Sequence, residues 1–313
     1  MVRGGTRYGA AEYSVHKTDL RRLHVILELA MSRLGLLGMV LLLSFGDVQA
    51  DDELAEALTF HAAFDESPDA NFAKGDRQIY TLDQVGGEKV VAGITVDEVK
   101  VEPTGGRWGG ALKFEDVTKQ IVMFQGKENV VYDPTGFDMT ISFWMSLTPD
   151  QDLKPGYVDP FQITDKKWND ASIFIDFTKD NPREVRLGCF SDFKHWNPTE
   201  TKWDEVAETD RPFVTVKQPP FDRDHWTHVV IVLERMNSTK LPSIARLYLD
   251  GRLQGQHLGP HQFTWDPEQL KIMLGIQYVG RLDDFSIFEG ALTLEQIRSL
   301  AELKNGVSDL YQR

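Results

Sequence analysis

The sequence has almost none of the residues that build disulfide-stapled domains. Cys189 is the single cysteine among 313 residues, so no disulfide can form within the chain. An exported domain without disulfides needs a hydrophobic core large enough to fold alone. Cys189 itself lies in the apolar stretch VRLGCF, which favours a small buried side chain over a nucleophile.

Basic residues are also scarce. The chain has 34 Lys and Arg against 48 Asp and Glu, a formal net charge of −14. Six of the basic and four of the acidic residues fall in 1–50, so residues 51–313 keep 28 basic and 44 acidic residues, a net charge near −16. Nucleic acids and anionic membranes are bound mainly through Lys and Arg. The charge therefore argues against a nucleic-acid partner and suits an exported protein that binds cations.

The N-terminal apolar run is too short for a stable membrane span. It extends from Leu34 to Phe45 and is about half of the ~20 residues that a spanning helix needs. Arg33 precedes it and Val48-Gln49-Ala50 follows it, which is the pattern of a secretory signal peptide cleaved after Ala50.

The domain organisation follows from that pattern. We predict a signal peptide over 31–50, and the alternative is an anchor that is not cleaved. A signal peptide implies bacterial export, so we expect the protein to be secreted, periplasmic or on the cell surface. Residues 1–30 are then an extended leader, or a start codon assigned too far upstream. No Gly-, Ser- or Pro-rich linker divides the remainder, so 51–313 is predicted to be a single domain.

Helical patterns are rare in this domain, and strand patterns dominate. Ten short segments are rich in β-branched and aromatic residues, and Gly, Pro, Asn or Asp separate them. Such a pattern predicts an all-β fold, a two-sheet antiparallel jelly-roll sandwich with a short C-terminal helix. The ten segments are 58–64, 110–114, 120–124, 139–147, 171–177, 184–190, 226–234, 244–251, 271–275 and 281–288.

One turn and one helix can be predicted closely. Asp250-Gly251 lies between two strand segments and is typical of a type I′ hairpin, whose central residues both need positive φ. Thr293 and Gln296 form a capping box, which predicts a helix start there. That helix is expected to bury Leu294, Ile297 and Leu300. In contrast, 148–170 and 191–225 are long, polar and aromatic, and are expected to be inserted loops.

Four motifs together resemble a known family. They are MTISFWMSL (139–147), HWTHVVIVLE (225–234), ARLYLDGRLQG (245–255) and GRLDDFSIFEGALTLEQI (280–297). In this order they resemble the LamG-like jelly-roll group of the concanavalin A-like lectin/glucanase superfamily, over most of 55–305. The resemblance implies the same sandwich fold. The two inserted loops depart from the simple family pattern, so no ligand preference can be transferred.

The resemblance also implies a calcium ion between the first and last strands, with Asp283 as its usual ligand. Strand periodicity puts Asp283 on one face with Phe285 and Ile287, so we expect its side chain to point inward. An unpaired carboxylate there would be costly. Ca²⁺ takes six to eight oxygen ligands, which clustered carboxylates and loop carbonyls provide.

The other candidate ligands come from both ends of the domain. The segment AFDESPDANFAKGD supplies Asp65 and Asp76, and Asp284 adjoins the main candidate. The predicted calcium site therefore comprises Asp65, Asp76, Asp283 and Asp284. In the alternative, Asp283 caps a turn or pairs with a basic residue such as Arg281, and the N-terminal aspartates lie in a solvated loop.

Familiar catalytic motifs are missing. Glucanases of this superfamily carry Glu-x-Asp-x-x-Glu on one strand. Here the one Glu-x-Asp, at Glu208 and Asp210, has Phe213 in place of the second Glu and lies in a Pro-rich stretch. No Gly-x-Ser-x-Gly or His-Glu-x-x-His motif occurs either. The sequence therefore predicts a non-catalytic protein.

Binding is the function that remains. Sugar sites combine aromatic faces with a few polar side chains, and the loops supply Trp168, Trp196, Trp203 and Asn197. We therefore predict recognition of a polysaccharide or a glycosylated surface partner. In one alternative these tryptophans only pin the loops to the sandwich, and the domain is a protein-interaction module. A glycoside hydrolase or lyase with an unfamiliar carboxylate pair is the third possibility.

Overall fold

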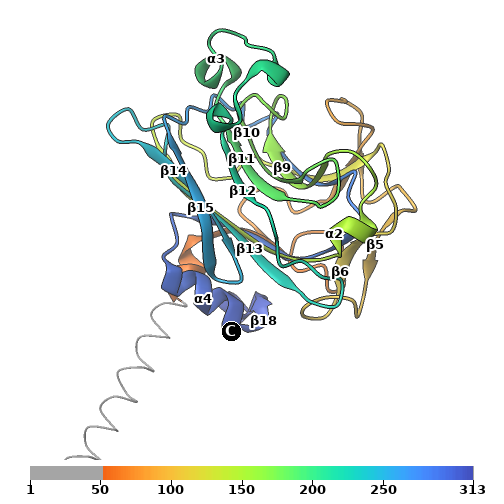
Figure 1. Ribbon diagram of the computed structural model, residues 1–313. Helices are drawn as coiled ribbons and strands as arrows, with labels where there is room; N and C mark the ends of the chain where they lie inside the picture. Colours follow the sequence, from red (N-terminus) through yellow and green to blue (C-terminus); the bar gives the residue numbers. More distant parts are fainter. Residues whose placement is uncertain (1–51, 313) are drawn as a thin grey trace, which may run out of the picture. The chain divides into compact units, whose positions relative to one another are not determined.

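Two antiparallel sheets make up the domain. The computed structural model describes residues 52–312, and these residues form one compact unit (Figure 1). The predicted leader (1–30) and signal peptide (31–50) lie outside the described residues. Within the described part of the chain, no helix is both long and apolar enough to cross a membrane.

The larger sheet has nine strands. Seven follow one another in the spatial order β15 (Arg252–Gly259), β14 (Ser243–Leu249), β13 (Thr227–Met236), β8 (Phe137–Ser146), β17 (Gly280–Glu289), β1 (Leu58–Ala62) and β2 (Phe72–Ala73). The other two are β6 (Ala111–Phe114), which pairs with β17, and β5 (Val99–Glu102), which pairs with β6. The first and last long strands, β1 and β17, are direct neighbours, as the family resemblance implies.

The smaller sheet has eight strands and packs against the larger one. Its order is β12 (Phe213–Val216), β11 (Val185–Phe190), β10 (Ser172–Phe177), β9 (Val158–Thr164), β16 (Lys271–Ile276), β7 (Ile121–Gln125), β3 (Tyr80–Leu82) and β4 (Val90–Ala92). The short remaining elements are α2 (Pro149–Asp152), α3 (Phe193–Trp196), η1 (Trp203–Glu205), η2 (Glu208–Asp210), α4 (Leu294–Glu302), β18 (Lys304–Val307) and η3 (Ser308–Leu310).

This architecture confirms the predicted jelly-roll sandwich, and each of the ten predicted strands is present. The Asp250-Gly251 turn has φ of 48° and 67°, as a type I′ hairpin requires. The expectation that 148–170 and 191–225 are irregular was wrong in part. The first contains β9, an interior strand of the smaller sheet, and the second contains β12. Pro160 conceals β9 in the sequence, because proline normally argues against an interior strand.

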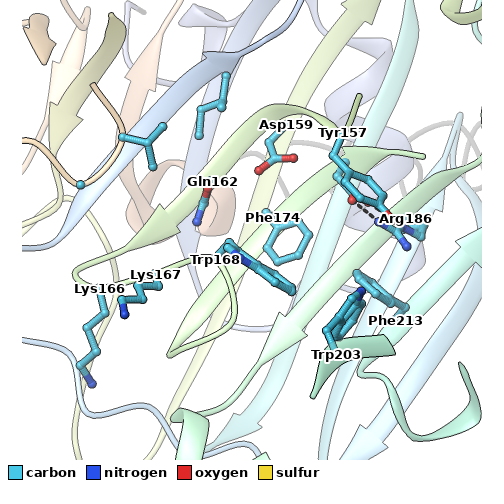
Figure 2. Close-up of a pocket in the computed structure, with 14 residues that line it drawn as sticks. Tyr157, Asp159, Gln162, Lys166, Lys167, Trp168, Phe174, Arg186, Trp203 and Phe213 are labelled. Carbon is cyan, nitrogen blue, oxygen red and sulfur yellow. Dashed lines mark hydrogen bonds and ion pairs between the residues drawn. The ribbon is translucent and has the colours of Figure 1, made fainter. Parts of the chain in front are cut away.

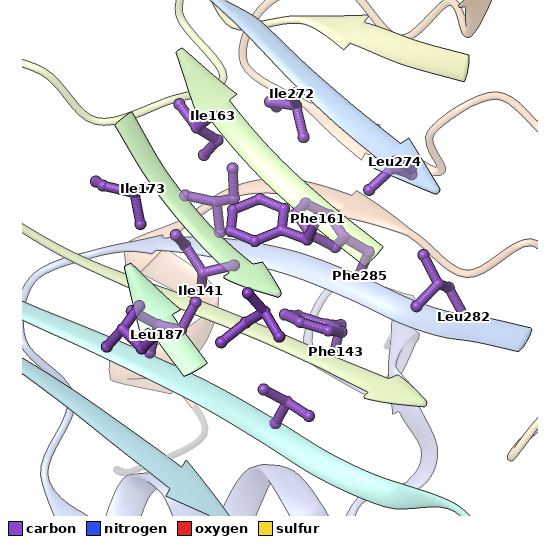
Figure 3. Close-up of a cluster of buried hydrophobic side chains, with 14 of the residues drawn as sticks. Ile141, Phe143, Phe161, Ile163, Ile173, Leu187, Ile272, Leu274, Leu282 and Phe285 are labelled. Carbon is purple, nitrogen blue, oxygen red and sulfur yellow. The ribbon is translucent and has the colours of Figure 1, made fainter. Parts of the chain in front are cut away.

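Phenylalanines join the two sheets at the centre of the core (Figure 3). Phe285 of β17 lies 5.7 Å from Phe143 of β8 and 5.4 Å from Phe161 of β9, between ring centroids. Phe60 of β1 approaches it from the other neighbouring strand, at 6.2 Å. All four side chains are fully buried. Because each ring interlocks with the facing sheet, the core fixes how the sheets are aligned.

Helix α4 covers the outer surface of the larger sheet. Its N-terminus has the predicted capping box, in which Thr293 Oγ1 accepts from the Gln296 backbone N–H. Ile297 and Leu300 are buried in a second apolar cluster beside Phe288 of β17. The expectation that Leu294 is buried was wrong. As the first helical residue it faces away from the sheet and is 40% exposed.

Phe285→Ala should lower the free energy of unfolding by about 3–5 kcal/mol, because it leaves a cavity where both sheets meet. Denaturant titration followed by tryptophan fluorescence measures the change. Leu294→Ala is the matched control and should stay within about 0.5 kcal/mol of the wild type. Equal losses in the two variants would contradict the assignment of the core.

Candidate functional site

A β-bulge in β9 turns an aspartate away from the core. Val158 and Phe161 both lie in the core, although they are three positions apart. Between them Asp159 and Pro160 lie opposite a single residue of β10, Asp176, where the register shifts. A bulge is also where a strand tolerates proline, since the ladder is interrupted there. The Asp159 side chain is thereby directed to the outer face of the smaller sheet.

Normal strand alternation brings four more side chains to this outer face. Gln162 of β9 lies between two core residues, and Phe174 and Asp176 of β10 alternate with core isoleucine and phenylalanine. Arg186 of β11 lies between core residues Val185 and Leu187 in the same way. These side chains, together with Asp159, form the floor of a cavity of about 590 Å³. That volume is within the range of small-molecule sites.

Aromatic side chains form the walls of this cavity, which we call the aromatic pocket (Figure 2). Tyr157 and Trp168 are 50% and 41% exposed, which is unusual for rings of this size. Trp203 lies 5.1 Å from Trp168 with the ring planes perpendicular, so the two rings form a corner. Phe213 of β12 packs edge-on against Trp203 at 6.0 Å. The pocket therefore offers flat apolar faces above a polar floor.

One ion pair sets the charge of the floor. Arg186 Nε donates to Asp176 Oδ1 at 2.8 Å, and its Nη2 donates to Asp176 Oδ2. The guanidinium also lies 4.1 Å from the Phe213 ring and 5.2 Å from the Tyr157 ring. Burial raises the pKa of Asp176, and the bond to Arg186 opposes that rise. Both oxygens of Asp176 are thus committed to one arginine.

Asp159 has no such partner. Among the described residues no hydrogen bond or ion pair reaches its carboxyl group, although it faces the pocket beside Tyr157 (Figure 2). Burial raises the pKa of Asp159 well above its usual value, the Asp176 charge adds to the rise, and Arg186 opposes it. The floor therefore holds one aspartate that is paired with an arginine and one that is not, and burial raises the pKa of both.

The four predicted ligand-binding residues divide into two groups. Trp168 and Trp203 line the aromatic pocket. Trp196 is instead part of the support: its Nε1 donates to Asn169 O at 2.8 Å, and its ring packs on Phe190. Asn197 is buried, and its side-chain amide bonds the backbone of Thr201 twice: Nδ2 donates to the carbonyl oxygen and Oδ1 accepts from the N–H. The second pair holds the 191–225 segment in place.

Sequence reasoning missed most of the pocket floor. The alternation of SIFIDF was enough to put Phe174 and Asp176 on one face of a strand, but nothing marked that face as lining a cavity. Asp159 and Gln162 were missed because β9 itself was not predicted. The only signal for Arg186 is that it is a charged residue within the predicted apolar strand 184–190.

A second bulge, in β17, overturns the expected direction of Asp283. Leu282 and Phe285 both lie in the core, and the pairing with β8 shifts between Asp283 and Ser286. Asp284, within the bulge, has φ of +51°, a conformation that aspartate tolerates better than most residues. Asp283 therefore does not share the core face of Phe285. Its side chain lies on the opposite face of the sheet, yet is only 1% exposed.

A glycine-rich loop covers Asp283. The backbone N–H groups of Arg107 and Trp108 donate to Asp283 Oδ2 at 2.6 and 3.2 Å. In the same loop the Gly110 N–H donates to Asp65 Oδ1 at 2.8 Å. Gly110 is required there, because a Cβ would lie 2.3 Å from the Phe64 carbonyl oxygen. Two of the predicted metal ligands, Asp65 and Asp283, therefore anchor this loop, GGRWGG (residues 105–110).

The other two predicted ligands have different surroundings. Asp284 Oδ1 lies 2.7 Å from His61 Nε2 and accepts from the Val307 N–H at 3.1 Å, which ties β17 to β1 and to β18. Asp76 is exposed, and its carboxylate accepts from the Gln78 N–H and the Tyr80 hydroxyl. The structure therefore gathers Asp65, Asp283 and Asp284, here called the aspartate cluster, and leaves Asp76 in a separate turn.

The aspartate cluster carries concentrated negative charge. Burial, the Asp284 charge and, to a smaller extent, the Asp65 charge raise the pKa of Asp283 to about 8, although two backbone N–H groups oppose the rise. Carboxylates that repel one another in a buried site are the oxygen-rich surroundings that Ca²⁺ prefers. However, no three His, Cys, Asp or Glu side chains of residues 52–312 converge closely enough to hold a metal ion. Any ion here would depend on carbonyl and water oxygens as well.

Comparisons with known proteins agree with this architecture. The family model described as the concanavalin A-like lectin/glucanases superfamily matches residues 127–298. No curated protein matches the chain.

Among solved structures, domain 4 of AbnA, a GH43 extracellular arabinanase from Geobacillus stearothermophilus, was determined with arabinotriose. It is 17% identical, with a TM-score of 0.50, over 78% of this chain and 98% of that one. The binding domain of botulinum neurotoxin DC, determined with rat synaptotagmin II, is 12% identical, with a TM-score of 0.52, over 82% of this chain and 52% of that one. A third structure is of botulinum neurotoxin type C, a toxin whose cell entry is described as dependent on interaction with two ganglioside molecules. It is 14% identical, with a TM-score of 0.51, over 82% of this chain and 52% of that one. This chain thus spans about half of each toxin chain, and at these identities the likeness shows the fold alone.

The two aspartates of the pocket floor should respond oppositely to the same substitution. Asp176→Asn leaves the nearly buried Arg186 without its carboxylate and should lower stability by about 3 kcal/mol. Asp159→Asn should be neutral or stabilising at neutral pH, because it removes a carboxyl group that is ionised at a cost.

The pH dependence follows from the direction of the Asp159 shift. A folded-state pKa above the unfolded value of about 3.9 makes the wild type lose stability as pH rises beyond roughly 4. The advantage of Asp159→Asn should therefore grow from about pH 4 upward in urea titrations. Equal destabilisation by the two substitutions would contradict the pairing of Arg186 with Asp176.

Proposed function

The chain belongs to the concanavalin A-like lectin/glucanases superfamily, and on that basis we propose that it is an exported, non-catalytic protein that binds a glycan in the aromatic pocket. The observation that carries the proposal is the exposure of Trp168 and Tyr157 above a polar floor. Exposed aromatic rings that gather around a cavity are typical of ligand-binding grooves, whereas singly scattered ones are not.

The chemistry of the pocket suits a sugar. A pyranose or furanose ring has an apolar C–H face, which an aromatic ring can cover, and a rim of hydroxyl groups. Trp168 offers such a face, while Asp159 and Gln162 offer hydrogen-bonding groups on the floor. The arabinotriose complex of the arabinanase domain and the ganglioside dependence of the type C toxin support a glycan ligand by analogy.

Hydrolysis is the second candidate, because the pocket holds two carboxyl groups whose surroundings differ. A neutral acid beside an ionised carboxylate is the arrangement of many glycosidases. Asp176, however, is held at both oxygens by Arg186 and is not free to act as a nucleophile or base. The glucanase-like Glu208 and Asp210 lie in η2, exposed and off the sheets. Binding is therefore the better-supported function.

A protein partner is the remaining alternative. The type D/C toxin neighbour was determined with rat synaptotagmin II, so this fold can also bind a protein. The exposed rings here surround a cavity and are not spread over a flat face, which favours a small ring-shaped ligand over a protein surface.

We also propose that the aspartate cluster holds a structural Ca²⁺, with Asp65 and Asp283 as its side-chain ligands. The mutual repulsion that raises the pKa values of Asp65 and Asp283 supports this proposal, because a bound cation would relieve it. The carboxylates already hold the GGRWGG loop through backbone N–H groups, so the chain can order this loop before the ion binds.

Trp168→Ala should weaken glycan binding at least tenfold, a loss of about 1.4 kcal/mol, because it removes the exposed apolar face. Affinity electrophoresis against a panel of neutral, acidic and basic polysaccharides identifies the class that binds. Isothermal titration with an oligosaccharide of that class then measures the variant. Leu253→Ala changes an equally exposed apolar side chain on β15, outside the pocket, and should bind like the wild type.

The alternatives give different results in the same assay. If the protein is folded and no polysaccharide slows its migration, the glycan proposal is contradicted and the protein-interaction module is favoured. Release of reducing ends from a retarding polysaccharide, lost in Asp176→Asn, would establish the hydrolase.

Calcium should raise the melting temperature. An ion present at a hundredfold excess over its Kd adds about 2.7 kcal/mol, which is roughly 5–10 °C for a domain of this size. Thermal unfolding in calcium and in EDTA measures the difference, and Asp283→Asn should abolish it. Asp76→Asn is the control and should keep the full calcium response. Identical melting curves in calcium and EDTA would overturn the proposed ion.

A further inference from the structure

The unpaired Asp159 is the part of the aromatic pocket that the proposed function does not explain. A neutral sugar needs hydrogen-bonding groups, and Gln162 or a serine would provide them without placing a carboxyl group in a buried site. Among residues 52–312, no cation is bonded to Asp159, because the nearest guanidinium is committed to Asp176. Within the described part of the chain, the carboxyl group of Asp159 is therefore left available to a ligand in the pocket.

We propose that the aromatic pocket selects glycans that carry a free amino group, and that the protonated amine pairs with the carboxylate of Asp159. This inference rests on the proposed function and deepens it, because it names the class of sugar. The ligand is an amino sugar without N-acetylation, presented as an oligosaccharide or at a polysaccharide terminus.

An ammonium group suits the pocket better than a hydroxyl group for two reasons. When Asp159 ionises, its charge adds to that of Asp176 and only one guanidinium opposes the two. A hydroxyl donor leaves that excess charge in place, whereas an ammonium group cancels it. The exposed ring of Trp168 adds to the preference, since its face attracts a cation through the ring quadrupole. The Trp203 ring shows the same attraction, because the Arg211 guanidinium already lies 4.3 Å from its centroid.

The lysines of the pocket do not cancel this preference. Lys166 Nζ lies 3.1 Å from Asp192 Oδ1 and 3.0 Å from Thr264 O, so its charge is already paired. In Figure 2, Lys166 and Lys167 lie together on the far side of Trp168 from Tyr157 and Arg186. In the same view Asp159 lies next to Tyr157, and Gln162 is drawn between it and the two lysines.

Binding has a definite proton balance. Burial and the Asp176 charge raise the pKa of Asp159 in the free protein, so its carboxyl group keeps a proton to higher pH than an ordinary aspartate does. Pairing with an ammonium group requires the carboxylate, so the proton of Asp159 leaves to solvent when the ligand binds. The groups that face Asp159 are Asp176 of β10, Arg186 of β11 and Tyr157 at the start of β9, with apolar Ile276 opposite it on β16. Of these, only the aspartates change charge in the pH range of interest.

Three hexasaccharides with the same β-1,4-linked backbone test the proposal. They are the hexamers of glucosamine, of N-acetylglucosamine and of glucose, which differ only in the group at C2. Isothermal titration of the purified chain at about pH 6, in two buffers of different ionisation enthalpy, gives affinity and proton release together. We expect the glucosamine hexamer to bind about tenfold more tightly than the other two, with a proton exchange that the other two do not show.

Asp159→Asn keeps the shape of the neutral acid and removes the ionisable group. It should bring the affinity for the glucosamine hexamer down to that of the glucose hexamer and abolish proton release. Asp210→Asn, an exposed aspartate outside the pocket, is the matched control and should behave like the wild type. Trp168→Ala should weaken any of the three ligands that bind.

The outcomes separate this inference from the function on which it rests. Binding of glucose and glucosamine hexamers with equal affinity, without proton release and unchanged in Asp159→Asn, would overturn the amine preference and leave glycan binding standing. The same holds if the polysaccharide panel yields only an amine-free ligand whose binding is unchanged in Asp159→Asn. Failure of every glycan in that panel and of all three hexamers would overturn both.

Discussion

The constraint on which the structure depends is the contact between the inner faces of its two sheets. Every strand that crosses this contact must present an apolar side chain at alternate positions, as Phe143, Phe161 and Phe285 do. The alternation fixes which residues point outward as firmly as it fixes the core, because a slip of one residue exchanges the two faces. The floor of the aromatic pocket is in this sense a consequence of the core.

Two bulges let the chain depart from strict alternation without disturbing the core. In β9 and in β17 the core residues are three positions apart, and both intervening residues face outward. In β9 one of these two residues is an aspartate, Asp159. In β17 both are aspartates, Asp283 and Asp284. An extra outward residue can carry polar chemistry that the sandwich itself does not need, which is why bulges often lie beside functional sites. The same local device therefore supplies both of the polar centres of this protein.

Sequence patterns predicted the architecture well and the sites less well, for reasons that particular residues make clear. The sequence predicted a strand over 171–177, and because β10 is regular, its alternation puts Phe174 and Asp176 on one face. Alternation misdirected Asp283, because a bulge is not visible in a two-residue period. It missed Asp159 altogether, because Pro160 conceals an interior strand. Trp168 and Trp203 were found by their aromatic character alone, whereas the separate structural role of Trp196 depends on contacts between segments distant in sequence.

The two polar centres differ in what neutralises their charge. The aspartate cluster has partners within the chain: backbone N–H groups of the GGRWGG loop for Asp283 and His61 for Asp284, and each bond ties one segment of the fold to another. Asp159 holds no segment, since nothing among the described residues bonds its carboxyl group. A partly buried acid that stabilises no contact is a net cost to folding. It is understandable at the floor of an open pocket only if its partner arrives with a ligand, and the aromatic walls around Asp159 are where a cationic sugar would meet it.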